Sequence, residues 1–273
     1  MKKKILITGG SGYLGQHLAK KLSTSYDVML GARDHKRNFM ASKNTGCESI
    51  PLDVSNMESV KDVFNSVKPD IVVHAAATKF VGLSEKYPME CVDINITGSQ
   101  NIARVAVDKG ISTVVGISTD KVSPPVHNIY GLSKSIMEKM YSSMSKQSDT
   151  EFLCVRYGNV VWSTGSVFPL WNEMMESNGK IESTGPHMRR FFFTVDDAVN
   201  LVLTGLKYSS ILNGKILARP MKAALIQDIL ERWVKKYGGS WEQIGERQGD
   251  RLDEFLIGET ECPYSYAQDF DSN

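Results

Sequence analysis

The chain has 273 residues, with 32 lysines and arginines against 31 aspartates and glutamates, so its formal net charge is +1. Proteins that bind nucleic acids or membrane surfaces normally carry excess positive charge, so this balance argues against both kinds of partner. The composition, 41% hydrophobic and 23% charged, is that of a globular protein long enough to bury a large core.

The N-terminus and the cysteines indicate a cytoplasmic protein. Lys2–Lys4 precede only a short apolar run and then glycines, too little for a signal peptide, and no apolar stretch is long enough to span a membrane. The four cysteines are scattered without a Cys-x-x-Cys pair. We therefore expect reduced thiols, no disulfide framework and no metal site.

Short β-branched runs alternate with helical periodicity through the first 160 residues. Several runs are apolar at consecutive positions, as in parallel strands buried on both faces. The expected strands are Ile5–Thr8, Asp27–Gly31, Ser49–Val54, Asp70–Ala76, Ser112–Ser118 and Glu151–Tyr157, and the expected helices are Leu14–Leu22, Met57–Val67, Met89–Lys109 and Tyr130–Ser145. This alternation predicts an α/β fold with a doubly wound parallel sheet, a Rossmann fold.

A glycine-rich turn follows the first expected strand and opens into a helix. Gly9 permits a tight turn, Gly12 lets the backbone approach a pyrophosphate, and Gly15 lets the helix pack on the strand. The helix N-terminus then points at the phosphates. The segment predicts a dinucleotide site with contacts from Gly9, Ser11, Gly12, Tyr13 and Leu14.

The residues at the end of the second expected strand favour NADP over NAD as the cofactor. Arg33 stands there with Arg37 close behind, and a guanidinium can accept a 2′-phosphate. Asp34 keeps NAD open, because a carboxylate can bind the ribose hydroxyls, and the arginines could also be solvated loop charges.

Further cofactor contacts are expected where the third and fourth strands end, since ligands of open α/β sheets bind at that edge. These contacts are Asp53, Val54, Ala75, Ala76 and Ala77. Tight packing of helix on strand explains the three alanines equally well.

Polar residues that can do chemistry follow the fifth expected strand. Tyr130 and Lys134 lie four residues apart and so share one helical face, where an ammonium can stabilise a phenolate and make the tyrosine a base. Thr119 offers a hydroxyl for the same substrate oxygen. Asp120 and Lys121 suit an acid–base pair, although a solvated turn is the ordinary interpretation of such a dipeptide.

These motifs resemble the extended short-chain dehydrogenase/reductases. The segments 73–79, 117–121, 155–161, 165–167, 189–194 and 247–254 narrow the resemblance to the inverting UDP-N-acetylglucosamine 4,6-dehydratases of bacterial surface polysaccharide synthesis. On this resemblance Tyr130, its pKa lowered by Lys134, deprotonates the C4 hydroxyl of the sugar, Lys121 removes the C5 proton, and Asp120 protonates the departing C6 hydroxyl.

The resemblance also assigns binding residues. It adds Tyr130, Lys134, Tyr157 and Val160 to the cofactor contacts, and it gives the nucleotide sugar the contacts Lys79, Asn159, Ser166, Val167, Arg190, Arg247, Arg251 and Glu254. The arginines could instead be ordinary surface residues, and Glu254 could simply pair with Arg251.

We expect residues 1–160 to form the NADP-binding domain and residues 161–273 mainly a substrate-binding lobe, with segments near 191–210 returning to the main domain. The lobe has expected helices near Phe168–Ser177 and Asp196–Lys207 and an amphipathic segment at Ala224–Tyr237. The helices Met89–Lys109 and Tyr130–Ser145 resemble those through which extended members associate, so a homodimer or larger homo-oligomer is expected.

Two other functions stay open. A nucleotide-sugar 4-epimerase or 4-keto reductase needs Tyr130 and Lys134 but not Lys121. A non-catalytic NADP-binding regulator is the other possibility, and the spacing of Thr119, Tyr130 and Lys134 argues against it. The loop 122–129, with two prolines, and Trp162 depart from the family pattern beside the expected sugar pocket.

Overall fold

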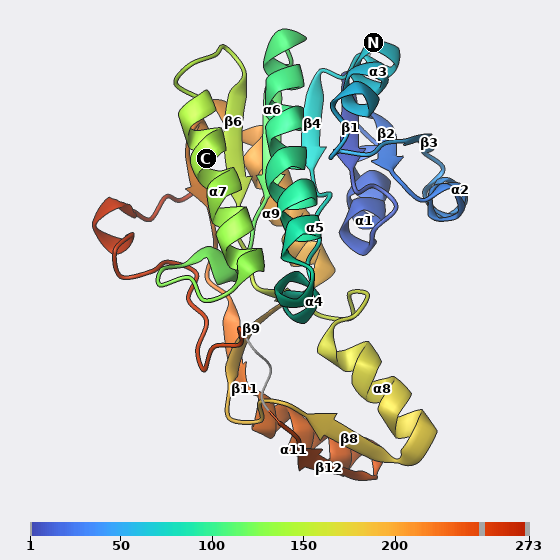
Figure 1. Ribbon diagram of the computed structural model, residues 1–273, viewed down its shortest axis with the longest axis vertical. Coiled ribbons are helices and arrows are strands. Elements are labelled where there is room, and N and C mark those ends of the chain that lie inside the picture. The colour runs from blue at the N-terminus through green and yellow to red at the C-terminus, as the bar shows by residue number, and fades with distance from the viewer. Residues whose placement is uncertain (1, 246–248, 271–273) are drawn as a thin grey trace.

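The structure, a computed structural model, describes residues 2–245 and 249–270. Its larger part is built on a seven-stranded sheet of order β10-β6-β5-β4-β1-β2-β3, in which all neighbours are parallel (Figure 1). The strands are β1 (Lys4–Thr8), β2 (Asp27–Ala32), β3 (Glu48–Pro51), β4 (Ile71–His74), β5 (Thr113–Ile117), β6 (Glu151–Val155) and β10 (Ile216–Leu217). This order is that of a Rossmann sheet, so the predicted fold class is confirmed.

Helices cover both faces of this sheet and bury two apolar cores. One core joins the sheet to α1 (Tyr13–Leu22), α2 (His35–Thr45) and α9 (Val195–Lys207). The other joins it to α3 (Met57–Val67), α6 (Gly98–Asp108) and α7 (Ile129–Met144). Because the strands are parallel and covered on both sides, their carboxyl ends meet at one edge, and polar residues gather there.

Two of these elements differ from the sequence predictions. Helix α2 was not expected, because it buries only Asn38 and Ala41 and so has little apolar periodicity; Asp34 caps its start and Gly46, in the left-handed region, ends it. The single expected helix 89–109 is instead α5 (Pro88–Cys91), the π-helical segment η1 (Val92–Thr97) and α6, preceded by α4 (Val81–Lys86).

A smaller lobe lies beyond the carboxyl edge of the sheet (Figure 1). Its core contains Trp171, Ile181, Met188, Leu230 and Trp233. It consists of a three-stranded sheet of order β11-β9-β7, a two-stranded sheet of β12 and β8, and two helices. These elements are β7 (Asn159–Val160), α8 (Val167–Asn178), β8 (Lys180–Ser183), β9 (Arg189–Phe193), β11 (Lys222–Leu225), α11 (Ile226–Tyr237) and β12 (Ser240–Gln243).

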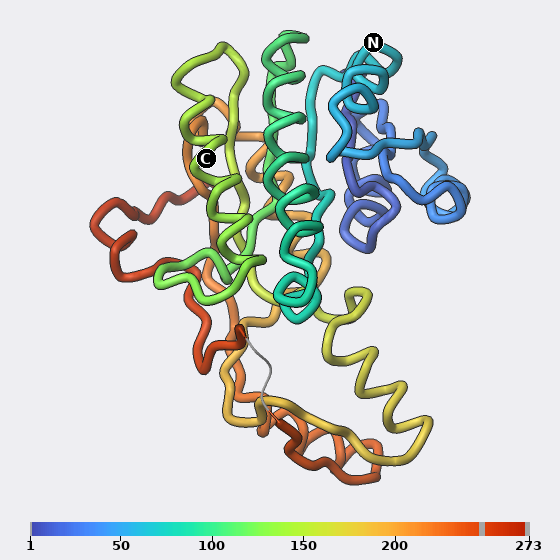
Figure 2. The backbone as a smooth tube through the Cα atoms, in the orientation of Figure 1, coloured from blue at the N-terminus to red at the C-terminus, as the bar shows by residue number. Residues whose placement is uncertain are grey.

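The chain crosses between the two parts more than once. After β9 it returns to the main domain through α9, α10 (Ser209–Leu212) and β10, and it then re-enters the lobe at β11. Residues 249–270 run back from the lobe toward α7, as the red trace in Figure 2 shows, and include the short helix η3 (Cys262–Tyr264). Among the described residues, no helix is long and apolar enough to cross a membrane.

Replacing Gly15 by alanine tests the packing of the glycine-rich turn. A Cβ atom at Gly15 would lie 2.7 Å from the Gly10 Cα, so we expect Gly15→Ala to lower the free energy of unfolding by about 3 kcal/mol. Gly82→Ala is the matched control: nothing lies within 4 Å of its new Cβ, so it should be neutral or stabilise by about 0.5 kcal/mol. Urea denaturation measures both, and equal effects would contradict the close approach.

Candidate active site

The glycine-rich turn forms one side of the site at the carboxyl edge of the sheet. Gly9 has φ +68°, and a Cβ there would lie 2.8 Å from the Ala76 backbone nitrogen, so the turn lies directly against the end of β4. The Gly12 N–H donates to the Gly9 carbonyl at 2.9 Å, and Gly12 begins α1 without a side-chain cap. This bare helix start beside a tight turn fits a dinucleotide pyrophosphate.

A buried histidine supports the glycine-rich turn through hydrogen bonds. His74 is fully buried; its Nδ1 lies 2.8 Å from the Thr8 Oγ1 and its Nε2 lies 3.0 Å from the Ser99 Oγ. The Thr8 hydroxyl in turn accepts the Ala76 N–H at 3.2 Å. Burial, assisted by the charge of Lys134, lowers the pKa of His74 to about 3, so the ring is neutral.

The residues expected to select the cofactor lie after β2 and β3. Arg33 and Arg37 are exposed. The Asp34 carboxylate accepts the Arg37 backbone N–H at 2.9 Å, and this hydrogen bond lowers the pKa of Asp34. The Asp53 carboxylate accepts the Ser55 hydroxyl at 2.7 Å. The Asp34 carboxylate therefore caps the start of α2.

The chemistry residues gather at the end of β5, where the short helix η2 (Asp120–Val122) begins. The Asp120 Oδ1 accepts two hydrogen bonds of 3.0 Å, from the Thr119 hydroxyl and from the Lys121 ammonium. Asp120 is fully buried, and its Oδ2 has no partner. A Cβ at Gly158 would lie 2.8 Å from that Oδ2, so the free oxygen lies against the backbone that follows β6.

Tyr130 and Lys134 are buried in the first turns of α7, next to this pair. Burial raises the pKa of Tyr130, although the charge of Lys121 and the hydrogen bond with Thr119 oppose it. Burial lowers the pKa of Lys134 to about 8, and its ammonium donates to the Met137 sulfur at 3.4 Å. The prediction that Lys134 lowers the Tyr130 pKa therefore differs from the structure, in which the cation acting on Tyr130 is Lys121.

The C-terminal segment 249–261, called the strap here, closes the site from the lobe side. The Asn128 amide donates to the Gly249 carbonyl at 3.1 Å, and Arg251 donates to the Ser123 carbonyl at 2.9 Å. Glu254 is 7% exposed and lies 3.9 Å from the Arg251 guanidinium. The strap thus lies on the proline-containing loop 122–129 and brings a second buried carboxyl group to the Asp120–Lys121 pair.

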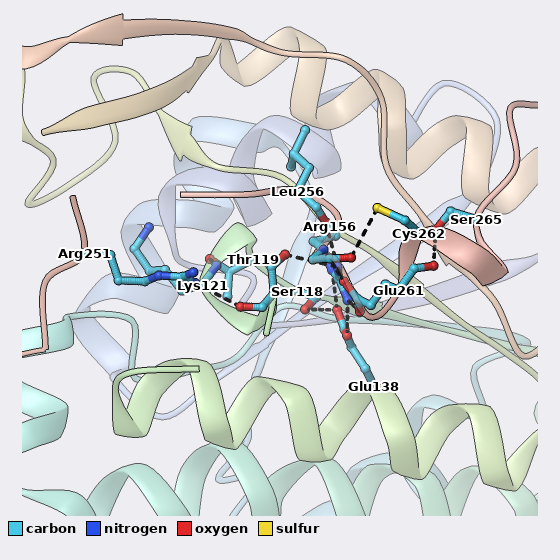
Figure 3. Close-up of polar contacts among 12 residues, drawn as sticks. Ser118, Thr119, Lys121, Glu138, Arg156, Arg251, Leu256, Glu261, Cys262 and Ser265 are labelled. Atoms are coloured by element: carbon cyan, nitrogen blue, oxygen red, sulfur yellow. Dashed lines mark hydrogen bonds and ion pairs between the residues drawn. The ribbon is translucent and has the colours of Figure 1, made fainter. Parts of the chain in front are cut away.

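A buried arginine that was not predicted as a site residue anchors the strap (Figure 3). Arg156 donates to Glu138 on α7 at 2.7 Å and to Glu261 of the strap at 2.8 Å, and it also binds the Leu256 carbonyl at 2.7 Å. Glu138 accepts a hydrogen bond from Ser118 as well. Glu138 lies four residues after Lys134 and so shares its helical face. This spacing is the sequence signal that could have identified Glu138, the partner of Arg156.

The remaining predicted substrate contacts come from other segments of the chain. Several take part in contacts within the chain: the Asn159 amide donates to the Phe191 carbonyl, the Lys79 ammonium to the Thr164 carbonyl, and the Arg190 guanidinium to the Leu252 carbonyl. Ser166 begins α8, with Val167 as its first residue, and the buried Ser166 hydroxyl has no partner. Arg247 lies outside the described residues.

Tyr157 and Val160, the other predicted cofactor contacts, follow β6. Tyr157 is buried and stacks near Phe193, with ring centroids 6.1 Å apart. Val160 packs against the core that includes α1 and α9.

The parallel sheet, the glycine-rich turn and the Thr119, Tyr130 and Lys134 set define an extended short-chain dehydrogenase/reductase. The model of the family described as "Polysaccharide biosynthesis protein" matches residues 5–270, and the chain belongs to this family. It is thus a nucleotide-sugar dehydratase or epimerase type of enzyme.

Three curated relatives of this chain include both a dehydratase and an epimerase. The chain is 33% identical to a UDP-N-acetylglucosamine 4,6-dehydratase (inverting) of Campylobacter jejuni, over 97% of this chain and 80% of that protein. It is 33% identical to a UDP-glucose 4-epimerase of Rickettsia bellii, over 95% and 79%. It is also 34% identical to the capsular polysaccharide biosynthesis protein CapD of Staphylococcus aureus over 95% of this chain, and it spans about half (46%) of that protein's length.

Solved structures resemble the chain along nearly its full length. The protein Pen from Bacillus thuringiensis superposes with a TM-score of 0.89 at 29% identity, covering 95% of this chain and 82% of that one. The dTDP-glucose 4,6-dehydratase DesIV from Streptomyces venezuelae, solved with NAD, superposes with a TM-score of 0.81 at 19% identity, covering 98% of this chain and 93% of that one. The latter likeness concerns the fold.

The buried His74 predicts a pH dependence of stability. Its pKa falls from 6.5 in the unfolded chain to about 3 in the folded protein, so between these values the unfolded state binds the extra proton. The stability is full above the unfolded pKa and is lost as the pH falls, by about 2 kcal/mol between pH 7 and pH 5. Denaturation of His74→Gln at both pH values should show a loss smaller by that amount; an unchanged loss would contradict the assignment.

Proposed function

We propose that the protein is an NADP-dependent nucleotide-sugar 4,6-dehydratase that inverts C5 and acts on UDP-N-acetylglucosamine or a related UDP-sugar. The observation that carries this proposal is the Asp120–Lys121 pair, joined at 3.0 Å beside Tyr130, with Asp120 fully buried. An enzyme that only oxidises and reduces C4 has no use for a second acid–base pair, whereas an elimination across C5 and C6 requires one.

The first step belongs to Tyr130. Its phenolate accepts the proton of the C4 hydroxyl, and the Thr119 hydroxyl, which lies against it, holds the same oxygen. A nicotinamide cofactor, when bound, accepts hydride from C4 and later returns it to C6. Burial keeps the pKa of Tyr130 above its ordinary value, so Tyr130 is a phenol at rest and loses its proton before this step; the positive charge of Lys121 opposes burial and lowers the cost of that loss.

The second step belongs to Lys121. The new C4 ketone acidifies the C5 proton, and a neutral lysine amine can remove it. Burial alone would lower the pKa of Lys121, but the charges of Asp120 and Glu254 and the hydrogen bond to Asp120 outweigh burial and raise it, so the resting side chain is an ammonium. Lys121 therefore gives a proton to a neighbouring carboxylate before it accepts the one from C5, which couples the base to an acid.

In this proposal the glycine-rich turn and Arg33 hold the cofactor. Gly9, Gly12 and the start of α1 would hold the pyrophosphate, and the exposed Arg33 would hold a 2′-phosphate. Lys134 would bind the nicotinamide half, since it lies buried four residues after Tyr130. The NAD bound in the dTDP-glucose 4,6-dehydratase structure keeps NAD as the alternative cofactor.

A UDP-sugar 4-epimerase is the second candidate, and the named Rickettsia relative favours it. It would use Thr119, Tyr130 and Lys134 alone. A homo-oligomer is also proposed, because Leu132 and Ile136 on α7 and Met89 on α5 are exposed apolar side chains on helices of the kind through which such enzymes associate.

Incubation with UDP-N-acetylglucosamine separates the two candidates. A dehydratase yields a product lighter by one water, and Lys121→Ala should lower that rate at least about 100-fold because C5 deprotonation loses its base. The exposed Lys146→Ala is the control and should leave it unchanged. A mass-neutral change of the sugar that survives in Lys121→Ala would establish the epimerase instead.

Cofactor binding tests the role of Arg33. Loss of a guanidinium–phosphate contact should weaken NADP binding about 10-fold or more in Arg33→Ala and leave NAD binding nearly unchanged. Lys36→Ala, at an exposed neighbouring position, is the control. Titration calorimetry measures both affinities, and equal weakening of NADP and NAD would contradict 2′-phosphate recognition.

A further inference from the structure

Asn128 lies between the strap and the helix that carries Tyr130. It is 3% exposed and directly precedes α7, which begins at Ile129. Both polar atoms of its side-chain amide are used: the Oδ1 accepts the Gly131 N–H at 2.7 Å, and the Nδ2 donates to the Gly249 carbonyl of the strap at 3.1 Å. One buried side chain therefore joins the start of α7 to a segment that lies 121 residues further along the chain.

The Oδ1 contact caps the helix. The first N–H groups of a helix have no partner within it, and an asparagine directly before the helix supplies one. The carboxylate of Glu85 on α4 supplies another, since it accepts the Ile129 N–H at 2.7 Å. Tyr130 lies between Ile129 and Gly131, the two residues whose N–H groups are bound in this way. These contacts therefore fix the turn from which the Tyr130 side chain projects.

The Nδ2 contact holds the strap against the same place. Gly249 has φ +83°, and a Cβ there would lie 3.1 Å from the Asn128 Cβ and 3.3 Å from the Val81 Cγ1 on α4. Two residues further on, the Arg251 guanidinium donates to the Ser123 carbonyl at 2.9 Å. The first described residues of the strap thus lie directly on the loop that leads into α7.

Apolar packing does little to hold the strap. Its large apolar side chains Leu252, Phe255 and Ile257 are exposed, and none of the described residues 249–261 belongs to one of the three apolar cores. The strap is held mainly by polar contacts, many of them to backbone atoms, so the loss of one such contact should be felt along it.

We propose that Asn128 is a positioning residue with two tasks: its Oδ1 places Tyr130 for proton transfer at C4, and its Nδ2 places the strap for binding of the nucleotide sugar. The inference rests on the proposed function in one respect, because the strap carries Arg251, a proposed contact of the nucleotide sugar. The two tasks belong to different atoms of one side chain, so substitutions can separate them.

Two substitutions at this position provide the kinetic test. Asn128→Ser keeps an oxygen that can cap α7 but has no amide to reach the strap, so it should raise the KM for UDP-N-acetylglucosamine about 10-fold and leave kcat within about 2-fold of the wild type. Asn128→Ala removes both contacts, so kcat should fall about 10-fold as well. Steady-state turnover measures both constants, and a role in stability alone would not divide them in this way.

Amide hydrogen exchange follows the same contacts without substrate. In Asn128→Ser the strap should exchange about 5-fold faster while the first turn of α7 exchanges as in the wild type, and in Asn128→Ala both segments should exchange faster. Asn56 offers a matched control, because its exposed side chain caps α3 through the N–H groups of Glu58 and Ser59 at 3.0 and 3.1 Å. Asn56→Ser and Asn56→Ala should leave KM, kcat and strap exchange at their wild-type values.

The outcomes separate this inference from the proposed function. If the wild type turns over no UDP-sugar, the proposed function fails, and the exchange measurement still decides the role of Asn128. An unchanged KM or an unchanged strap exchange in Asn128→Ser overturns the inference, and so does a kcat that falls equally in Asn128→Ser and Asn128→Ala.

Discussion

The site depends on one buried guanidinium. Arg156, 3% exposed at its side chain, is bound on one side by Glu138 of α7 and on the other by Glu261 of the strap. Removing one partner of such a buried set leaves an uncompensated charge, at a cost of about 3–5 kcal/mol. Arg156 therefore ties three distant segments together, namely the end of β6, the helix that carries Tyr130 and Lys134, and the strap that carries Glu254.

This tie explains how chemistry residues from separate parts of the chain reach one place. The parallel strands deliver Thr119, Asp120 and Lys121 to the carboxyl edge, and α7 brings Tyr130 beside them. The strap then adds Glu254 from the far end of the chain. Oxidation at C4 needs only Thr119, Tyr130 and Lys134, whereas elimination across C5 and C6 also needs the Asp120–Lys121 pair. That pair is thus the feature that distinguishes the proposed dehydratase from a simpler oxidoreductase.

The fold was predictable from sequence because buried parallel strands produce apolar runs and the glycine-rich turn has a fixed spacing. Helix α2 was not predicted because Asn38 and Ala41 are its only buried side chains. The position of the strap was not predicted for another reason. Arg156 and Glu261 are 105 residues apart, and Arg251 and Ser123 are 128 apart; polar contacts over such separations leave no local pattern. The raised Tyr130 pKa was missed because spacing alone does not report burial.

The most direct measurement is a crystal structure with the nicotinamide cofactor and UDP-N-acetylglucosamine bound. We expect the Lys121 Nζ to lie roughly 3–4 Å from C5, and the Tyr130 hydroxyl to lie within hydrogen-bond distance of the C4 hydroxyl. A sugar bound with C5 and C6 turned away from Lys121, and with only C4 at Tyr130, would contradict the proposed elimination.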